Sequence, residues 1–367
     1  MNAAPSGPPH SRSLSIMITQ ILLTGDVLRP PLGAQDVNIR WMYELLRSPL
    51  EKATGLPVAA LCSDAVANCI PAIYGSYGKG FDTSAWAAIS CAEPSDVLCS
   101  ALRPHVERSL VLCFECPSVL SACFRRLGVP LIEILVHPVR FYFDLLLAFR
   151  CSVPSIQSAL SRFRVEWSEL VSAARLIRDR LAGKCLINED FSIITVQVPW
   201  DRSVILEGKF ASILDFPDAL DAFLARSKKV FIKPHPDIGI PEDVAEWASE
   251  LAIEPVNENF YSLVSSPRLH EVLSLSSSTL DEAEAFGVRT TRLLPRVHRF
   301  TYAEDALGGT DFGVVYEYWS WPAFWSEVLS SIIPTQTLPW QPPEQPRTLR
   351  ESRGLSWDWR PEFLPRP

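Results

Sequence analysis

Two stretches of this chain decide its fold, Lys229-Val230-Phe231-Ile232-Lys233-Pro234-His235-Pro236 and Val272-Leu273-Ser274-Leu275-Ser276-Ser277-Ser278. The first is an apolar strand that ends in a His-Pro pair, and the second is a strand that runs into a serine cluster at the start of a helix. In open α/β sheets, ligands bind beyond the carboxyl ends of the strands. The two stretches therefore predict a shared pocket at one sheet edge.

The rest of the chain repeats the same alternation of strand and helix. In the first half, strands are predicted at 16–23, 58–62, 110–114 and 131–135, with helices such as 37–46 and 119–127 between them. In the second half, strands are predicted at 191–198, 229–233, 272–275 and 291–294, with helices at 217–225, 241–251 and 279–286. Such alternation predicts parallel sheets covered by helices, hence an α/β fold of two Rossmann-like domains with a cleft between them.

The predicted domain limits follow from composition and periodicity. Residues 1–14 are rich in Pro and Ser and are expected to be disordered. An N-terminal domain is expected over 15–185, with a connector helix at 155–182, and a C-terminal domain over 186–330. The apolar run 141–149 is predicted to be a core helix, and 316–329 an aromatic-rich helix. The Pro- and Trp-rich tail, 331–367, is expected to pack back onto the first domain.

The composition excludes several classes of protein. The 367 residues are 47% apolar and carry a net charge of −8, which is globular and not the basic footprint of a nucleic-acid binder. Nine cysteines lie between Cys62 and Cys185, and their odd number, without a signal peptide, indicates a reducing cytoplasm. The single CxxC, Cys113 to Cys116, has no partner at zinc spacing, so no metal site is predicted. No transmembrane segment is evident, and peripheral contact with a membrane or an assembly complex stays open.

The serine cluster predicts an anion site. Free backbone N–H groups at a helix start attract a phosphate, and the hydroxyls of Ser276, Ser277 and Ser278 add donors. The alternative is that the serines only cap the helix. Glu282, one turn further on, is a candidate for the ribose hydroxyls, or else an acid that complements the helix dipole.

His235 is the candidate that stabilises the phosphate as it leaves, since a nearby anion favours the imidazolium. The alternative is a structural histidine at a strand end. Lys233 is a second positive group, although strand alternation can turn it to the other face. From these residues alone, a nucleotide-sugar transferase is the leading hypothesis.

Carboxylates and cations at other strand ends complete the predicted cleft. Asp201, after the first strand of the second domain, is a candidate base or nucleophile, or an ordinary loop residue. Glu115, His137 and Arg140 follow strands of the first domain. Arg140 is a candidate for a sugar carboxylate, with an i,i+4 ion pair to Asp144 as the alternative.

With these motifs the chain resembles the β-Kdo transferases of bacterial capsule and lipopolysaccharide synthesis, which are GT-B enzymes that use CMP-Kdo. The resemblance runs from Glu115 to Gly287 and more weakly through the Trp-rich tail. The matching stretches are Phe114-Glu115-Cys116-Pro117, His137-Pro138-Val139-Arg140-Phe141, the segment from Gln197 to Ser203, Lys233-Pro234-His235-Pro236, Asn259-Phe260-Tyr261 and the segment from Ser276 to Gly287. One departure is Phe143 before Asp144, where the family tends to have two acids.

The resemblance implies a retaining transfer of β-Kdo to an oligosaccharide or lipid-linked glycan, at the cytoplasmic side, with no metal. It implies that Asp201 is the nucleophile, that His235 and Ser276 to Ser278 hold CMP, and that Glu282 holds its ribose; Glu115 is the candidate acid/base. Gln197 and Asn259 lie within the matching stretches and are taken as substrate-binding candidates. A CMP-sialic-acid or other nucleotide-sugar transferase of the same fold, and a non-catalytic nucleotide-sugar-binding subunit, remain the alternatives.

Overall fold

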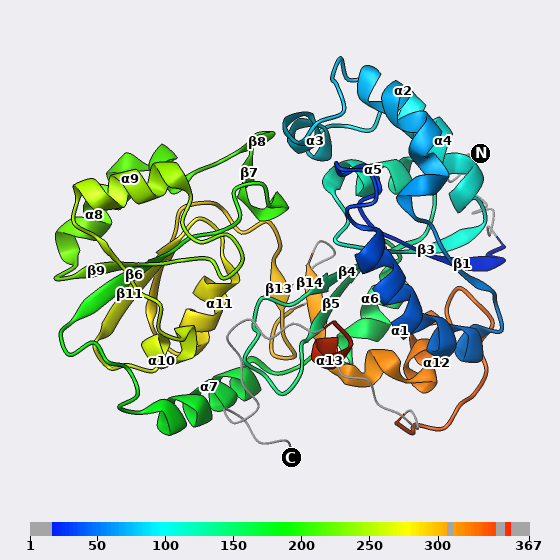
Figure 1. Ribbon diagram of the computed structural model, residues 1–367. Coiled ribbons are helices and arrows are strands. Elements are labelled where there is room, and N and C mark those ends of the chain that lie inside the picture. Colours follow the sequence, from blue (N-terminus) through cyan, green and yellow to red (C-terminus); the bar gives the residue numbers. More distant parts are fainter. Residues whose placement is uncertain (1–16, 307–310, 343–348, 354–367) are drawn as a thin grey trace, which may run out of the picture.

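The computed structural model describes residues 17–306, 311–342 and 349–353, which form two α/β lobes side by side (Figure 1). Within these residues, one sheet has seven strands in the order β13-β14-β5-β4-β3-β1-β2. The other has five strands in the order β10-β9-β6-β11-β12. The predicted α/β class is therefore confirmed, and each half of the sequence supplies most of one sheet.

The first lobe is built around a central parallel run of strands. These are β1 (Gln20–Thr24), β2 (Val58–Ala60), β3 (Ser109–Phe114) and β4 (Leu131–Val136), connected through helices that include α1 (Asp36–Thr54), α3 (Thr83–Ser90), α4 (Asp96–Val106) and α5 (Ser118–Arg126). All six residues of β3 are buried, as expected for a strand covered on both faces. Cys113 and Cys116, the CxxC pair, are buried free thiols.

The other edge of this sheet is mixed, which the sequence did not predict. The run 141–149 was expected to be a helix, but it contains bends followed by β5 (Leu147–Cys151), antiparallel to β4. On its other side β5 pairs with β14 (Phe312–Val315), which in turn pairs with β13 (Phe300–Thr301). A short apolar run has no period that separates a buried strand from a buried helix, which is why the sequence did not reveal β5.

The predicted connector helix 155–182 is two helices, α6 (Pro154–Ser161) and α7 (Trp167–Leu181). The break occurs because the chain between them pairs with β14. Arg164 forms a bridge with Val315, and the N–H of Val165 donates to the Val314 carbonyl at 2.9 Å. Apolar residues keep their three- and four-residue spacing across the break, so periodicity alone does not reveal it.

The second lobe is a fully parallel sheet. Its strands are β6 (Phe191–Thr195), β9 (Val230–Lys233), β10 (Glu254–Pro255), β11 (Leu269–Ser274) and β12 (Arg289–Arg292), and its helices include α8 (Pro217–Arg226), α9 (Glu242–Glu250), α10 (Phe260–Val264) and α11 (Ser278–Ala285). A hairpin of β7 (Ile205–Leu206) and β8 (Lys209–Phe210) reaches α3 of the first lobe. A Cβ at Gly208 would lie 3.1 Å from the Ala88 Cα, so this contact depends on glycine.

The lobes share a hydrophobic core near their boundary. Phe141 of the first lobe packs edge-on against Phe286 of the second, with ring centroids 5.2 Å apart, and against Tyr261 at 6.3 Å. All three rings are fully buried. These buried contacts join the two lobes.

The C-terminal part of the chain returns to the first lobe. After η4 (Glu317–Ser320) and α12 (Pro322–Leu329), the N–H of Gln336 donates to the Ala53 carbonyl, and Trp340 packs on Phe163. The predicted aromatic helix 316–329 is thus a 3₁₀ turn followed by a shorter helix. The last described element is α13 (Leu349–Arg353). The expectations for residues 1–14 and for the parts of the tail at 343–348 and 354–367 lie outside the described residues.

Over the part of the chain that the structure describes, every helix is too short or too polar to cross a membrane.

Candidate active site

A cavity of about 480 Å³ lies where the two sheets face each other. Both lobes line it, with Glu115 and Arg140 from the first and Asp201, His235 and Ser276 from the second. The other polar or charged lining residues include Arg29, Gln197, Arg202, Ser203, Lys233, Ser278, Asp281, Glu282, Arg292, Arg296 and His298.

Strand ends place the central residues. Glu115 follows the last residue of β3 and has φ +49°, a conformation that is uncommon outside glycine. Lys233 is the last residue of β9, and His235 lies two residues beyond it. Ser276 lies two residues beyond β11, which is separated from β9 by β6. The predicted pocket at the carboxyl edge is thus present as a cavity.

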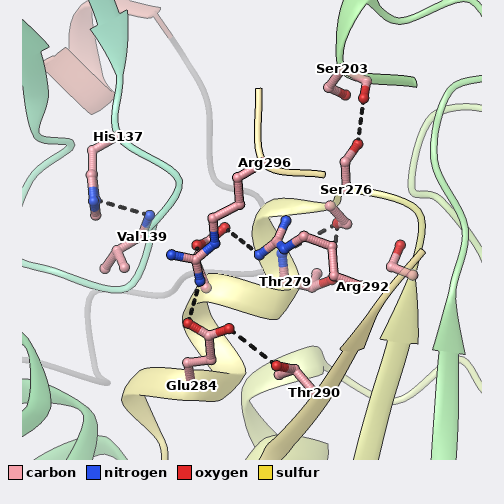
Figure 2. Close-up of polar contacts among 12 residues, drawn as sticks. His137, Val139, Ser203, Ser276, Thr279, Glu284, Thr290, Arg292 and Arg296 are labelled. Atoms are coloured by element: carbon pink, nitrogen blue, oxygen red, sulfur yellow. Dashed lines mark hydrogen bonds and ion pairs between the residues drawn. The ribbon is translucent and has the colours of Figure 1, made fainter. Parts of the chain in front are cut away.

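The three serines have three different roles in the structure. The Ser277 hydroxyl accepts the Thr279 N–H at 3.2 Å and caps α11, so the capping interpretation is correct for this residue. The Ser276 backbone N–H donates to the Gln197 Oε1 at 2.7 Å, and its hydroxyl donates to the Ser203 carbonyl at 2.6 Å (Figure 2 shows the latter). Ser276 and Ser278 line the cavity. Gln197 therefore holds the start of the serine loop in place.

His235 lies in a tight turn at the cavity wall. Its backbone N–H and carbonyl both bond to Gly239, at 2.9 Å each, and its Nδ1 accepts the Asp237 N–H at 3.2 Å. Neutral His235 therefore carries its proton on Nε2. Burial lowers the pKa of His235, and the charges of Asp237 and Asp201 oppose this change. An anionic ligand would act in the same direction as these carboxylates.

Asp201 and Glu115 are carboxyl groups that line the cavity from different lobes. The Asp201 Oδ1 accepts the Ser203 N–H at 2.7 Å, which fixes one carboxyl oxygen. Burial raises the pKa of Glu115, the charge of Arg202 opposes this, and the charge of Asp201 raises it further. A carboxyl group with a raised pKa beside one held by a backbone N–H is an arrangement suited to acid/base and nucleophilic roles.

The Lys233 ammonium donates to the Glu258 carbonyl at 2.9 Å, although the residue also lines the cavity. This agrees with the strand alternation noted in the sequence. Asn259 is the N-cap of α10, where its Oδ1 accepts the Tyr261 N–H at 2.9 Å. Asn259 is not part of the cavity lining.

His137 is buried and does not line the cavity, contrary to expectation. Its Nδ1 accepts the Val139 N–H at 3.2 Å, and its Nε2 lies 3.0 Å from the Tyr302 hydroxyl (Figure 2 shows the Val139 bond). Burial and the nearby charges of Arg140 and Arg296 lower the pKa of His137 to about 3. This histidine is a neutral core residue that shapes the loop leading to Arg140.

Glu282 and Arg140 join the two lobes. The Glu282 Oε1 accepts the Arg140 backbone N–H and the Tyr261 hydroxyl, each at 2.7 Å. Glu282 is 3% exposed, and burial raises its pKa to about 7. The carboxyl expected to bind ribose thus bonds to protein groups. The alternative ion pair from Arg140 to Asp144 does not form in the described structure, because 141–144 are bends and the Asp144 carboxylate accepts the N–H groups of Leu349 and Arg350.

Five further lining residues escaped the sequence reasoning, namely Arg29, Arg202, Arg292, Arg296 and His298. Arg292 and Arg296 both pair with Asp281, at 3.2 and 3.1 Å. Arg296 also pairs with Glu284, as Figure 2 shows. Three of them could have been predicted from their position, because Arg292, Arg296 and His298 lie at or just after the end of β12. Among the residues that the structure describes, no three His, Cys, Asp or Glu side chains are grouped so as to hold a metal ion.

No protein-family model and no curated protein matches the chain. Among solved structures, it is similar to Thermosulfurimonas dismutans KpsC, described as a β-Kdo 2,7 transferase, with 14% identity, a TM-score of 0.40, and 75% of this chain and 79% of that chain covered. A second structure, the KpsC β-Kdo 2,4 transferase of the same organism, gives 11% identity and a TM-score of 0.35, with 74% and 78% covered. Similarity this low assigns no function.

Proposed function

We propose that the chain is a retaining glycosyltransferase of GT-B type that moves β-Kdo from CMP-Kdo to a sugar of a bacterial surface polysaccharide, either capsule or lipopolysaccharide. The observation that carries the proposal is the convergence of Asp201, Glu115, His235 and the serine-led start of α11 on one cavity between two α/β lobes. The sequence motifs that resemble β-Kdo transferases contain these same residues. In this proposal the second lobe binds the donor and the first lobe receives the acceptor glycan.

The donor phosphate would lie between His235 and Ser278. An imidazolium and free N–H groups at the start of an eight-residue helix both favour an anion. The same contacts stabilise the charge that develops on the phosphate as CMP leaves. Because CMP leaves with a single phosphate, we expect the transfer to need no metal ion.

The chemistry follows in two displacements. The Asp201 carboxylate attacks the anomeric carbon of Kdo, and a bond from carbon to the Asp201 oxygen forms as the bond to the phosphate oxygen breaks and CMP departs. An acceptor hydroxyl then attacks the same carbon, its proton passes to the ionised Glu115 carboxylate, and Asp201 leaves. Two inversions give net retention.

Replacing Asp201 by Asn tests the nucleophile. Asp201→Asn is expected to abolish transfer, by about a thousandfold or more, while the affinity for CMP measured by thermal shift or calorimetry is kept. His235→Ala is the matched variant on the donor side, and it is expected to weaken CMP binding. In the wild type, a mass increase of one Kdo on the peptide that contains Asp201 would identify the covalent adduct.

Four outcomes would change or contradict the assignment. A wild-type protein that is stabilised by UDP and not by CMP would be a transferase of another donor class, and one stabilised by CMP-sialic acid but not CMP-Kdo would point to a sialyltransferase. A protein that binds CMP but shows no transfer to lose would be a non-catalytic nucleotide-sugar-binding subunit. Absence of any stabilisation by CMP contradicts the whole proposal.

A further inference from the structure

Two arginines, Arg29 and Arg202, form hydrogen bonds between the lobes next to Asp201. The Arg29 Nη2, from the first lobe, donates to the Trp200 carbonyl at 3.1 Å. The Arg202 Nη1, from the second lobe, donates to the Glu115 carbonyl at 2.5 Å. Because Trp200 and Arg202 flank Asp201 in the chain, the candidate nucleophile lies between two guanidinium–carbonyl bonds that run in opposite directions.

Within the described structure, neither guanidinium bonds to a carboxylate, although the carboxyl groups of Asp26 and Glu115 interact with both charges over longer distances. Arg29 lies 4.6 Å from the centre of the Trp86 ring, and the Arg202 Nη2 donates to the His298 Nε2 at 3.1 Å. Burial, with the charges of two arginines, lowers the pKa of His298 to about 3, so this ring is neutral. Among the residues that the structure describes, no carboxylate oxygen lies within 4.0 Å of a guanidinium nitrogen of Arg29 or Arg202.

Two other arginines of the cavity wall, Arg292 and Arg296, are already paired with carboxylates. Arg292 and Arg296 share the Asp281 carboxylate, and Arg296 also pairs with Glu284, so that group is balanced in charge. A cation held only by neutral acceptors in a half-buried wall favours an anionic ligand more strongly than one already paired with a carboxylate.

Donors remain available on both side chains. A guanidinium has five N–H groups, and the bonds described above use two of them in Arg202 and one in Arg29. Both residues line the cavity. The remaining N–H groups suit the planar, two-pronged binding of a carboxylate.

The reacting sugar brings such a carboxylate. In a 2-keto sugar acid the carboxylate is bonded directly to the anomeric carbon, which is the atom that Asp201 would attack. The cations that bind this carboxylate must therefore lie close to Asp201, and Arg29 and Arg202 both bond beside it.

We propose that Arg29 and Arg202 together bind the carboxylate of the transferred sugar and so select donors with a charged group on the anomeric carbon. This inference rests on the proposed function. It differs from the sequence expectation, which made Arg140 the candidate for the sugar carboxylate.

The test compares CMP with CMP-Kdo as ligands of otherwise identical proteins. Asp201→Asn prevents turnover, and Arg202→Gln or Arg29→Gln is added to it; affinities are measured by calorimetry. Each added variant is expected to weaken CMP-Kdo binding about tenfold or more and CMP binding by less than about twofold. Arg202→Lys keeps the charge but loses the fork, so its loss for CMP-Kdo should be intermediate. Arg47→Gln on the exposed face of α1 is the control and should change neither affinity.

CMP-sialic acid, which also has a carboxylate on its anomeric carbon, should lose affinity in parallel if the protein binds it. Equal losses for CMP and CMP-Kdo, or none for either, overturn the role of the arginines and leave the proposed function standing. If the Asp201→Asn protein with both arginines intact binds neither CMP nor CMP-Kdo, the proposed function fails first, and the inference fails with it. A loss confined to CMP-Kdo in Arg202→Gln and Arg29→Gln supports the pair.

Discussion

Glu282 is a buried carboxyl group that holds two segments of different lobes. Its Oε1 accepts the Arg140 N–H and the Tyr261 hydroxyl, and burial raises its pKa from an ordinary 4.5 to about 7. Between pH 4.5 and 7 the folded protein therefore keeps a proton that the unfolded chain has lost. The stability that Glu282 contributes is fully present below pH 4.5 and is lost as the pH rises to about 7.

Glu282→Gln should remove this dependence, because the amide keeps an acceptor oxygen and does not ionise. Relative to the wild type, the variant is expected to gain about 1–3 kcal/mol in free energy of unfolding between pH 5 and pH 8. Urea unfolding at the two pH values measures this difference. Glu250→Gln, an exposed position on α9, is the control. Parallel pH dependences for the wild type and Glu282→Gln would mean that the carboxyl does not titrate in this range.

At the scale of one element, α11 combines a structural cap with a candidate ligand site. Ser277→Ala removes the side chain that accepts the Thr279 N–H, and it should lower the free energy of unfolding by about 1 kcal/mol. Because Ser277 does not line the cavity, the affinity for CMP should change by less than about twofold. Ser278→Ala, at the cavity wall, should show the opposite pattern, with weaker CMP binding. A large loss of CMP affinity in Ser277→Ala would contradict this division of roles.

The elements of the second lobe were predictable because each is local. Strand, turn residue and helix start follow one another in sequence, so the alternation that contains Lys233, His235 and Ser276 predicts where the chain reaches the carboxyl edge. β5 was not predicted, because a short apolar run has no period that separates a buried strand from a buried helix; it pairs both with the nearby β4 and with β14, about 165 residues away. The break between α6 and α7 was not predicted either, because the apolar spacing continues across it.

The candidate site shows the same limit. Asp201, Glu115 and His235 were found because they stand at strand ends within recognisable motifs. Arg29 and Arg202 were not, because their significance lies in the partners that they meet across the lobes. His137 also follows a strand within a motif and was expected at the cleft. In the structure its ring contacts Val139 and Tyr302 in the core.

At the scale of the whole molecule, the C-terminal segment fastens the loop that leads into the cavity. The Asp144 carboxylate accepts the N–H groups of Leu349 and Arg350, at 2.7 and 2.9 Å. The Arg350 guanidinium in turn donates to the carbonyls of Arg140 and Tyr142, at 2.5 and 3.4 Å. α13 is therefore held on the same loop, 140–144, by its backbone and by a side chain.

These two attachments should be coupled. Asp144→Ala and Arg350→Ala are each expected to cost about 1–3 kcal/mol in free energy of unfolding. If either substitution releases α13 from the loop, the second contact no longer stabilises the fold. The loss in free energy of unfolding of the double variant should therefore be smaller than the sum of the two single losses by at least about 0.5 kcal/mol. Urea unfolding of the four proteins measures the coupling. Asp144→Ala combined with Ser277→Ala, which shares no contact with it, should be additive. Additivity of Asp144→Ala with Arg350→Ala would mean that α13 does not dock as a unit on the loop that contains Arg140.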